Sequence, residues 1–256
     1  DKSNKKIFLN QKCLKFIHTS CNFTKQKILN FGIEPSKVVM VPLGVDLNLF
    51  RPTSIEVKEK TRDLLGIPKG SLVIGSFQKD GNGWGEGLEP KLIKGPDVFI
   101  KAVRELAKDY PVFVLLVGPS RGYAKKELEK NNIAYKSMGY VENFNEVASY
   151  YKALDLYLVT SRIEGGPQAI LESMASGVPL VSTKVGMAVD VIFDGENGFL
   201  AEVENISEIV QKAKLIIENQ TLREKLIKNA LEAVKDYSWE KISQRYLQEI
   251  YLKLIN

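Results

Sequence analysis

The sequence predicts an α/β protein built on a Rossmann-like, doubly wound parallel sheet. Short runs rich in Val, Ile and Leu alternate with longer amphipathic stretches through most of the 256 residues. Most of these runs are apolar on both faces, as in parallel strands that helices cover on each side. Beyond Ile206 only helical periodicity remains. The sheet is therefore expected to precede a closing set of helices.

The elements follow from the same patterns in chain order. Strands are predicted at residues 14–18, 38–41, 72–77, 112–117, 154–160, 179–182 and 198–201. Helices are predicted at residues 95–108, 125–130, 143–150 and 167–176, and then at 207–219, 221–235 and 238–254. Pro167 is expected in the first turn of its helix, where a missing N–H costs nothing. Trp239, Tyr246 and Tyr251 recur near helical spacing and are interpreted as core packing.

A linker at residues 42–52 divides the chain, because Pro42, Gly44 and Pro52 favour an extended segment. The piece before it holds too few elements for a Rossmann domain of its own. The chain also starts on a polar stretch at Asp1, with neither an initiator methionine nor a signal peptide. We therefore expect a fragment in which most of a first domain is missing.

Composition excludes several classes of protein. Hydrophobic residues make up 44% and charged residues 26%, as in an ordinary globular protein. The sequence contains no run of about 18 apolar residues, the length needed to span a bilayer. The net charge of +5 comes from scattered lysines, which argues against nucleic-acid binding. It leaves phosphate-bearing substrates or an anionic membrane surface open.

The two cysteines, Cys13 and Cys21, resemble reduced thiols of a cytosolic protein. His18 lies between them, but a structural zinc site needs four ligands and the chain has no further His or Cys. No metal site is predicted.

The densest chemical signal is SRIEGGPQAILESMASGVPLVST at residues 161–183. Glu164 lies in a glycine-containing loop after a strand, and Glu172 follows eight residues later on the next helix. The unpaired N–H groups and the dipole at a helix N-terminus favour a diphosphate there. Glu172 could then reach a ribose while Glu164 faces a sugar. The alternative, in which both glutamates are ordinary surface residues, stays open on spacing alone.

These residues resemble the E-x7-E motif of the retaining GT4 glycosyltransferases (glycosyl transferases group 1), which have the GT-B fold. Four further segments are similar to that family in the same order. They are KVVMVPLGVDLNLFRP at 37–52, Gly139-Tyr140-Val141, residues 155–161 before the motif and DGENGFL at 194–200.

The resemblance assigns three parts to the chain. Residues 1–45 would be the end of an N-terminal acceptor domain with the linker. Residues 46–237 would be the domain that binds a nucleotide-sugar, and residues 238–256 a helix that packs back across the junction.

It also implies roles for individual residues. Glu172 would bind ribose hydroxyls, Glu164 the transferred sugar, and Lys94 the leaving diphosphate, so that Lys94 and Glu164 are the catalytic candidates. Gly118 would face the donor cleft. Backbone near the diphosphate would come from Gly166, Pro167, Gln168 and Ala169, and Gly139, Tyr140 and Val141 would flank the base.

The sequence departs from the family at Ser76, where an arginine is usual, and Lys79 or Lys91 would have to replace its charge. The loop QKDGNGWGEGLEPKL at 78–92 contains four glycines and is either a mobile cover over the donor or a surface insertion. Pro167 offers no N–H, so neighbouring amides would have to bind the phosphate.

Other motifs are weaker. GPSRG at 118–122 matches a nucleophile elbow, but a hydrolase of that type needs a downstream histidine and His18 is upstream. GNGWG at 81–85 lacks the spacing of a dinucleotide-binding loop, and no P-loop motif occurs.

The resemblance thus implies retaining, metal-independent transfer of a hexose from a UDP- or GDP-sugar to a saccharide or lipid-linked acceptor. No cofactor beyond the donor is expected. The expected place is the cytoplasm, at the inner face of the membrane with peripheral contact. Two alternatives remain: a catalytically incomplete binding module, and a GT-B protein that epimerises or phosphorolyses sugars.

Overall fold

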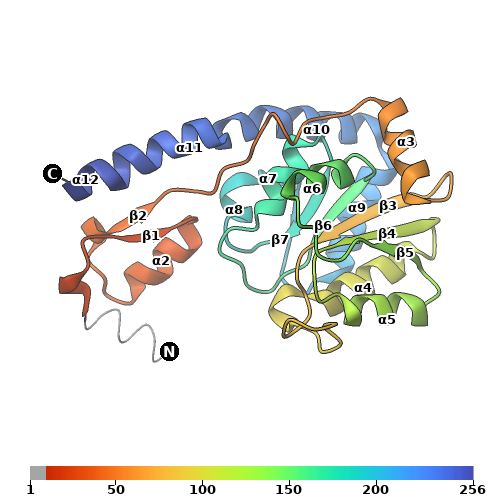
Figure 1. Ribbon diagram of the computed structural model, residues 1–256, viewed down its shortest axis with the longest axis horizontal. Helices are drawn as coiled ribbons and strands as arrows, with labels where there is room; N and C mark the ends of the chain where they lie inside the picture. The colour runs from red at the N-terminus through yellow and green to blue at the C-terminus, as the bar shows by residue number, and fades with distance from the viewer. Residues whose placement is uncertain (1–9, 256) are drawn as a thin grey trace.

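Two parallel sheets organise residues 10–255, the part of the chain that the computed structural model describes (Figure 1). The larger sheet has the order β5-β4-β3-β6-β7-β8, and every neighbouring pair in it is parallel. Its strands are β3 (Leu72–Phe77), β4 (Val112–Val117), β5 (Ala134–Ser137), β6 (Leu156–Val159), β7 (Leu180–Thr183) and β8 (Phe199–Ala201). The smaller sheet pairs β1 (Ile17–Thr19) with β2 (Val38–Met40). The predicted doubly wound α/β fold is confirmed.

Helices connect the strands and close the chain. The first part contains α2 (Asn22–Asn30) and α3 (Ile55–Leu65). The sheet connections are α4 (Pro96–Leu106), α5 (Gly122–Lys130), α6 (Phe144–Tyr151), α7 (Gln168–Ala175) and α8 (Ala188–Val191). The last helices are α9 (Ile206–Glu218), α10 (Gln220–Ala233), α11 (Trp239–Tyr246) and α12 (Leu252–Ile255), with a π-helical stretch at Leu247–Tyr251.

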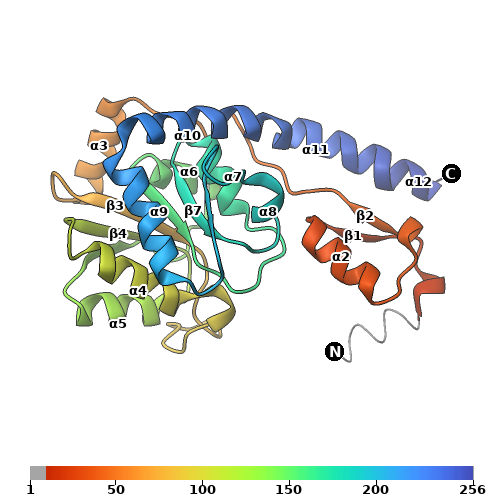
Figure 2. The same cartoon turned by 180° about the vertical axis from the view of Figure 1, so that it is seen from behind.

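Helices bury both faces of the large sheet. Adjacent residues of each central strand point to opposite faces and therefore belong to different cores. Val73 of β3 belongs to a core formed with α6 and α7, whereas Ile74 belongs to a second core formed with α4, α5 and α9. Figures 1 and 2 show these helices distributed over the two faces of the sheet. This double coverage explains why the strands are apolar on both sides.

The strand order reverses direction between β3 and β6. From β3 the chain continues outward to β4 and β5, whereas β6 starts the series β7 and β8 on the other side. The connections on the two sides diverge at this point and open a crevice beyond the carboxyl ends of β3 and β6. The fold therefore provides one preferred place for a ligand.

The structure differs from the sequence prediction in the bounds of some elements and contains others that the sequence did not predict. The strand predicted at 14–18 is the shorter β1, and the helix predicted at 125–130 begins earlier, at Gly122. The sequence did not predict β5, an edge strand whose polar residues lack the apolar pattern of the central strands. It also missed α3 and gave no bounds for α2, since a helix that packs only one residue or none into the core gives a weak periodic signal.

The linker after β2 is fixed to the start of the C-terminal helices. The N–H of Val45 donates to Tyr237 O at 2.8 Å, and the N–H of Trp239 donates to Val45 O at 3.1 Å. Figures 1 and 2 show α11 and α12 running back over β1 and β2. There Arg245 Nη2 donates to Met40 O at 3.1 Å, and the hydroxyl of Tyr246 lies 3.1 Å from His18 Nε2.

The aromatic residues of this helix are not core residues, contrary to the sequence interpretation. Trp239 is 40% exposed and Tyr251 is 58% exposed. These residues lie on a helix that packs against the linker and stays partly exposed to solvent. Helical periodicity is the same for such a helix as for one in a core, so the sequence pattern could not distinguish the two.

The division of the chain at residues 45/46 and 237/238 stays a prediction. Residues 1–9 and Asn256 of the predicted terminal parts lie outside the described residues. Among residues 10–255, no helix combines the length and apolar character that crossing a bilayer requires.

Replacement of Gly44 tests the contact between the linker and α11. A Cβ atom at Gly44 would lie 2.6 Å from Cε3 of Trp239, so we expect Gly44→Ala to reduce the free energy of unfolding by about 1–3 kcal/mol. The measurement is thermal unfolding followed by circular dichroism. Gly85→Ala is the matched control, since no atom lies within 4 Å of its added Cβ. Equal unfolding temperatures for both variants would contradict the close packing.

Candidate functional site

A cavity of about 440 Å³ occupies the crevice beyond the carboxyl ends of β3 and β6. Ten residues that line it carry its polar and backbone chemistry: Gln78, Lys79, Lys91, Lys94, Gly118, Glu164, Gly166, Gln168, Ala169 and Glu172. Its apolar wall includes Phe77, Phe144, Val147 and Pro167. This volume and mixed lining are typical of a pocket for a small polar ligand.

The N-terminus of α7 forms one wall of this cavity. Pro167 is the N-cap of α7, with φ −70° and ψ 94°, and the helix itself starts at Gln168. This corrects the prediction that Pro167 lies in the first turn. Because the first N–H groups of a helix have no intrahelical partner, the amides of Gln168 and Ala169 are available to an anion.

Glu164 and Lys94 form the charged end of the cavity. Lys94 ends the 3₁₀ helix at Leu92–Lys94, and its Nζ donates to Glu164 Oε1 at 2.6 Å. The hydroxyl of Ser161 donates to the same oxygen at 2.8 Å. Only 12% of the Glu164 side chain is exposed. The protein therefore holds one carboxylate oxygen of Glu164, and the other is available to a ligand.

Glu172 also lines the cavity and is 6% exposed. Its Oε2 accepts a hydrogen bond from the hydroxyl of Tyr151 at 2.9 Å. Burial raises the pKa of Glu172 to about 7, although the hydrogen bond from Tyr151 lowers it. The carboxyl group therefore holds its proton to a higher pH than an exposed glutamate does.

The glycine-rich loop carries Lys79 and Lys91 to the cavity and is fastened at its base. The N–H of Lys91 donates to Asp80 O at 2.7 Å, and the N–H of Gly122 donates to Glu86 O at 2.7 Å. At its tip Trp84 is exposed, and Lys79 Nζ lies 3.6 Å from the centre of its indole ring. The loop thus has an ordered base and an exposed aromatic tip.

A buried ion pair anchors this loop, and the sequence reasoning missed it. Arg121 Nε lies 2.8 Å from Asp80 Oδ1, and both side chains are almost inaccessible to solvent. The guanidinium also donates to Ser76 O at 2.5 Å and to Ser76 Oγ at 3.0 Å. Arg121 belongs to the GPSRG segment, which is the turn from β4 into α5.

Ser76 itself is fully buried and does not line the cavity. An arginine is nevertheless present against it, because Arg121 comes from the neighbouring strand end. Its charge is paired with Asp80. The cations that line the cavity are the three lysines, Lys79, Lys91 and Lys94.

Gly139, Tyr140 and Val141 follow β5 at the rim of the cavity. The N–H of Gly118, which lines the cavity, donates to Gly139 O at 2.8 Å. Tyr140 is 71% exposed and Val141 is half-buried. The structure therefore places this segment beside the cavity without making it part of the lining.

A second cavity of about 480 Å³ lies at the opposite end of the sheet, near the amino end of β3. Two cations that line this cavity, Lys58 and Arg62, are already paired, because each lies 2.7 Å from a carboxylate oxygen of Asp155. In the described part of the chain, no three His, Cys, Asp or Glu side chains gather as a metal site would require. The crevice at β3 and β6 remains the better candidate site.

The sequence of this chain is similar to those of known proteins. The family model described as Glycosyl transferases group 1 matches residues 88–233, which is more than half of the chain. An uncharacterised glycosyltransferase of Methanocaldococcus jannaschii is 34% identical over 150 residues, 58% of this chain and 42% of that protein. The D-inositol 3-phosphate glycosyltransferase of a Nocardioides species is 28% identical over 242 residues, 87% of this chain and 50% of that protein. The chain spans about half the length of these two relatives.

Solved structures share the fold. The crystal structure of Anabaena HepE in complex with UDP and glucose has a TM-score of 0.77 and 23% identity. The similarity covers 93% of this chain and 63% of that chain. At this level of identity it is evidence of fold alone.

Removal of Arg121 tests the buried pair beneath the loop. Arg121→Ala leaves Asp80 buried without its partner, so we expect a loss of about 3–5 kcal/mol in the free energy of unfolding at pH 8. The double variant Asp80→Ala/Arg121→Ala should lose less than the sum of the single variants, as measured by urea unfolding. Lys108→Ala, in an exposed pair with Glu105, is the control with a change below about 0.5 kcal/mol. Additive losses would contradict the coupling.

The raised pKa of Glu172 predicts a pH dependence of stability. The folded state keeps its proton up to about pH 7, whereas an unfolded glutamate loses it near pH 4.3, so ionisation of Glu172 opposes folding as pH rises. Glu172→Gln removes this cost. As pH rises from 4.5 to 7.5, the free energy of unfolding of Glu172→Gln should increase by roughly 3 kcal/mol relative to that of the wild type. Above pH 7.5 this difference should stay constant.

Urea unfolding across this pH range measures that difference. Glu240→Gln is the control, because Glu240 is exposed on α11. A stability difference between Glu172→Gln and the wild type that stays constant with pH would show that the pKa of Glu172 is not raised.

Proposed function

The chain belongs to the glycosyl transferases group 1 family, and on that premise we propose that it binds the nucleotide-sugar donor of a retaining hexosyl transfer. The observation that carries this proposal is the cavity at the strand-order reversal. It combines the N-terminus of α7, three lysines and two carboxylates that each offer one oxygen. A diphosphate with a sugar on each side needs these groups together.

The donor would lie across the cavity with its diphosphate at the N-terminus of α7. The amides of Gln168 and Ala169 and the ammonium group of Lys94 would bind the phosphate oxygens. Glu172 would accept hydrogen bonds from the ribose. The base would extend toward Gly118 and the rim formed by residues 139–141. The UDP and glucose held by Anabaena HepE support a UDP-sugar, with a GDP-sugar as the alternative.

Catalysis would depend on charge stabilisation. Cleavage of the bond between the anomeric carbon and the diphosphate leaves positive charge on the sugar and negative charge on the phosphate. Lys94 stabilises the phosphate and Glu164 binds a sugar hydroxyl, so the fixed charges favour the transition state over the bound donor. The lysines supply the positive charge that a metal ion supplies elsewhere, which is the basis for proposing a metal-independent reaction without a further cofactor.

The Lys94–Glu164 pair suits this role, because Lys94 Nζ already lies 2.6 Å from Oε1 of the proposed sugar-binding glutamate. On donor binding, the ammonium group would bridge Glu164 and the diphosphate. Glu164 would thereby fix the lysine as well as bind the sugar.

The acceptor would be a saccharide or a lipid-linked sugar, bound by the part of the longer relatives that this chain does not cover. We propose a cytoplasmic location at the inner membrane face, which suits the net charge of +5. A second candidate function is a binding module without turnover. The pairing of Arg121 with Asp80, together with Ser76 in place of an arginine, favours it, because the cavity then has one cation fewer.

Thermal unfolding with UDP, GDP, ADP and CMP tests the donor site. A nucleotide at about 100 times its dissociation constant should stabilise the chain by roughly 2.7 kcal/mol, a shift of several degrees. Glu172→Ala and Lys94→Ala should each remove the shift, whereas Glu240→Ala should keep it. If no nucleotide shifts the wild type, the donor site proposed here is wrong for this chain.

Release of UDP from UDP-glucose in the presence of an upstream acceptor domain and sugar acceptors separates the two candidate functions. Turnover that Lys94→Ala abolishes supports the transferase. Nucleotide binding without turnover supports the binding module.

A further inference from the structure

The buried side of Glu172 is closed by one hydroxyl group, that of Tyr151. Tyr151 is fully buried on α6, and its hydroxyl donates to Glu172 Oε2 at 2.9 Å. The same hydroxyl lies 3.5 Å from Ala169 O, which is a much weaker contact. Within residues 10–255, no other side chain forms a hydrogen bond with this carboxyl group.

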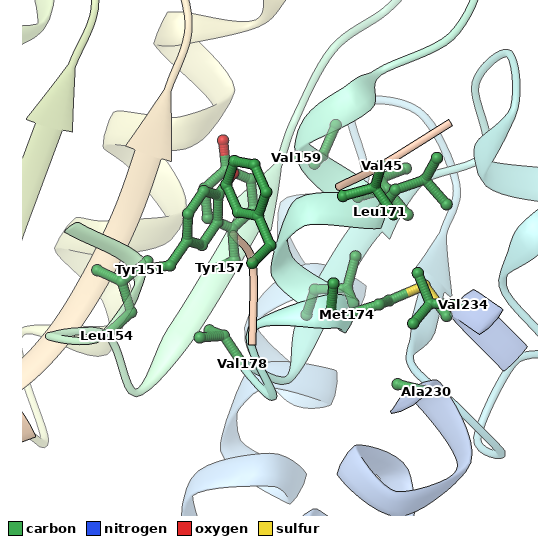
Figure 3. Close-up of a cluster of buried hydrophobic side chains, with 14 of the residues drawn as sticks. Val45, Tyr151, Leu154, Tyr157, Val159, Leu171, Met174, Val178, Ala230 and Val234 are labelled. Atoms are coloured by element: carbon green, nitrogen blue, oxygen red, sulfur yellow. The ribbon is translucent and has the colours of Figure 1, made fainter. Parts of the chain in front are cut away.

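The ring of Tyr151 cannot move freely, because three aromatic rings surround it. The ring centroids of Phe77, Tyr157 and Phe50 lie 4.7, 5.5 and 5.7 Å from that of Tyr151. Figure 3 shows Tyr151 and Tyr157 side by side in this cluster. The hydroxyl of Tyr151 is therefore held at a fixed point beneath the cavity.

The neighbouring hydroxyl of Tyr157 has a different role. It accepts a hydrogen bond from the N–H of Phe77 at 2.9 Å and lies 3.3 Å from Phe77 O. It thus braces the end of β3. The other titratable groups that face Glu172 across the cavity are Lys79, Lys91, Lys94 and Glu164.

A carboxylate with one oxygen held in this way can present the other in a single direction. Oε2 of Glu172 is engaged by Tyr151, so Oε1 is the oxygen left to the cavity that Glu172 lines. An ionised Oε1 accepts a hydrogen bond from a ligand hydroxyl, whereas a protonated carboxyl group accepts less well. Both the orientation and the charge of Glu172 thus bear on hydroxyl binding.

We propose that Tyr151 is a positioning residue of the donor site, whose hydroxyl holds Glu172 so that its free oxygen receives a ribose hydroxyl of the donor. This inference rests on the proposed nucleotide-sugar function. It adds a residue that contacts no ligand and acts only through the glutamate.

Donor binding through Glu172 should depend on pH. Burial raises the pKa of Glu172 to about 7 and the Tyr151 hydroxyl opposes this rise, so loss of the hydroxyl raises the pKa further. Donor binding favours the ionised carboxylate and should therefore release a proton near neutral pH. Tyr151→Phe should weaken binding most where Glu172 is no longer ionised.

The experiment compares Tyr151→Phe with the wild type in two measurements. Phenylalanine keeps the ring in its aromatic surroundings and removes only the hydroxyl. A carbon-13 NMR titration of the glutamate carboxyl groups, assigned with Glu172→Gln, should show the Glu172 pKa rising by about one unit. Calorimetry with UDP should show affinity about fivefold weaker at pH 7 and within about twofold at pH 9. At each pH, dividing the dissociation constant of Tyr151→Phe by that of the wild type removes the effect of the titration of UDP itself.

Tyr150→Phe is the matched control, because Tyr150 is half-buried on the same helix and has no hydrogen bond with Glu172 in the described structure. It should leave both the Glu172 pKa and the pH dependence unchanged. An unchanged Glu172 pKa in Tyr151→Phe, or a UDP affinity at pH 7 equal to that of the wild type, would overturn the proposal. If UDP fails to bind the wild type, the donor function is wrong and this inference falls with it. The NMR titration then reports whether Tyr151 holds Glu172 in the free protein.

Discussion

The pairing of β3 with β6 is the constraint on which the rest of the structure depends. Ile74 and Gly75 face Leu156 and Tyr157 in parallel register, although some 80 residues of chain lie between the two strands. Because the connections leave this pair in opposite directions, the sheet is covered on both faces and its carboxyl edge is left open at one point. The loops after β3 and β6 and the N-terminus of α7 all meet there.

Two glutamates lie at the open edge, and the protein forms hydrogen bonds with only one oxygen of each. Each of the two glutamates has one oxygen engaged, Glu164 by Lys94 and Ser161 and Glu172 by Tyr151. The engaged oxygens fix the direction of the remaining ones, which lowers the entropy lost when a ligand binds. Burial near the aromatic cluster also makes the charge of Glu172 costly, so a ligand that binds the ionised carboxylate has to offset part of that cost.

The ion pair between Asp80 and Arg121 connects the glycine-rich loop to the turn after β4. The pair is buried at an Nε–Oδ1 distance of 2.8 Å, and the guanidinium also holds the end of β3 through Ser76. The loop beyond them bears Trp84 and Lys79 in an exposed cation–π contact. The hydroxyl of Ser120 donates to Gly85 O at 2.9 Å and so also holds the backbone beside Trp84.

The sequence determined the fold class, the central strands and the E-x7-E segment, because apolar periodicity and a strand–loop–helix order are local properties of the chain. It could not find β5 or α3, which contribute little apolar pattern and gain stability from neighbours distant in sequence. Nor could it place Arg121 against Ser76, or Tyr151 beneath Glu172. These pairs lie 45 and 21 residues apart, and only the packing of parallel strands and their helices brings such side chains within hydrogen-bonding distance.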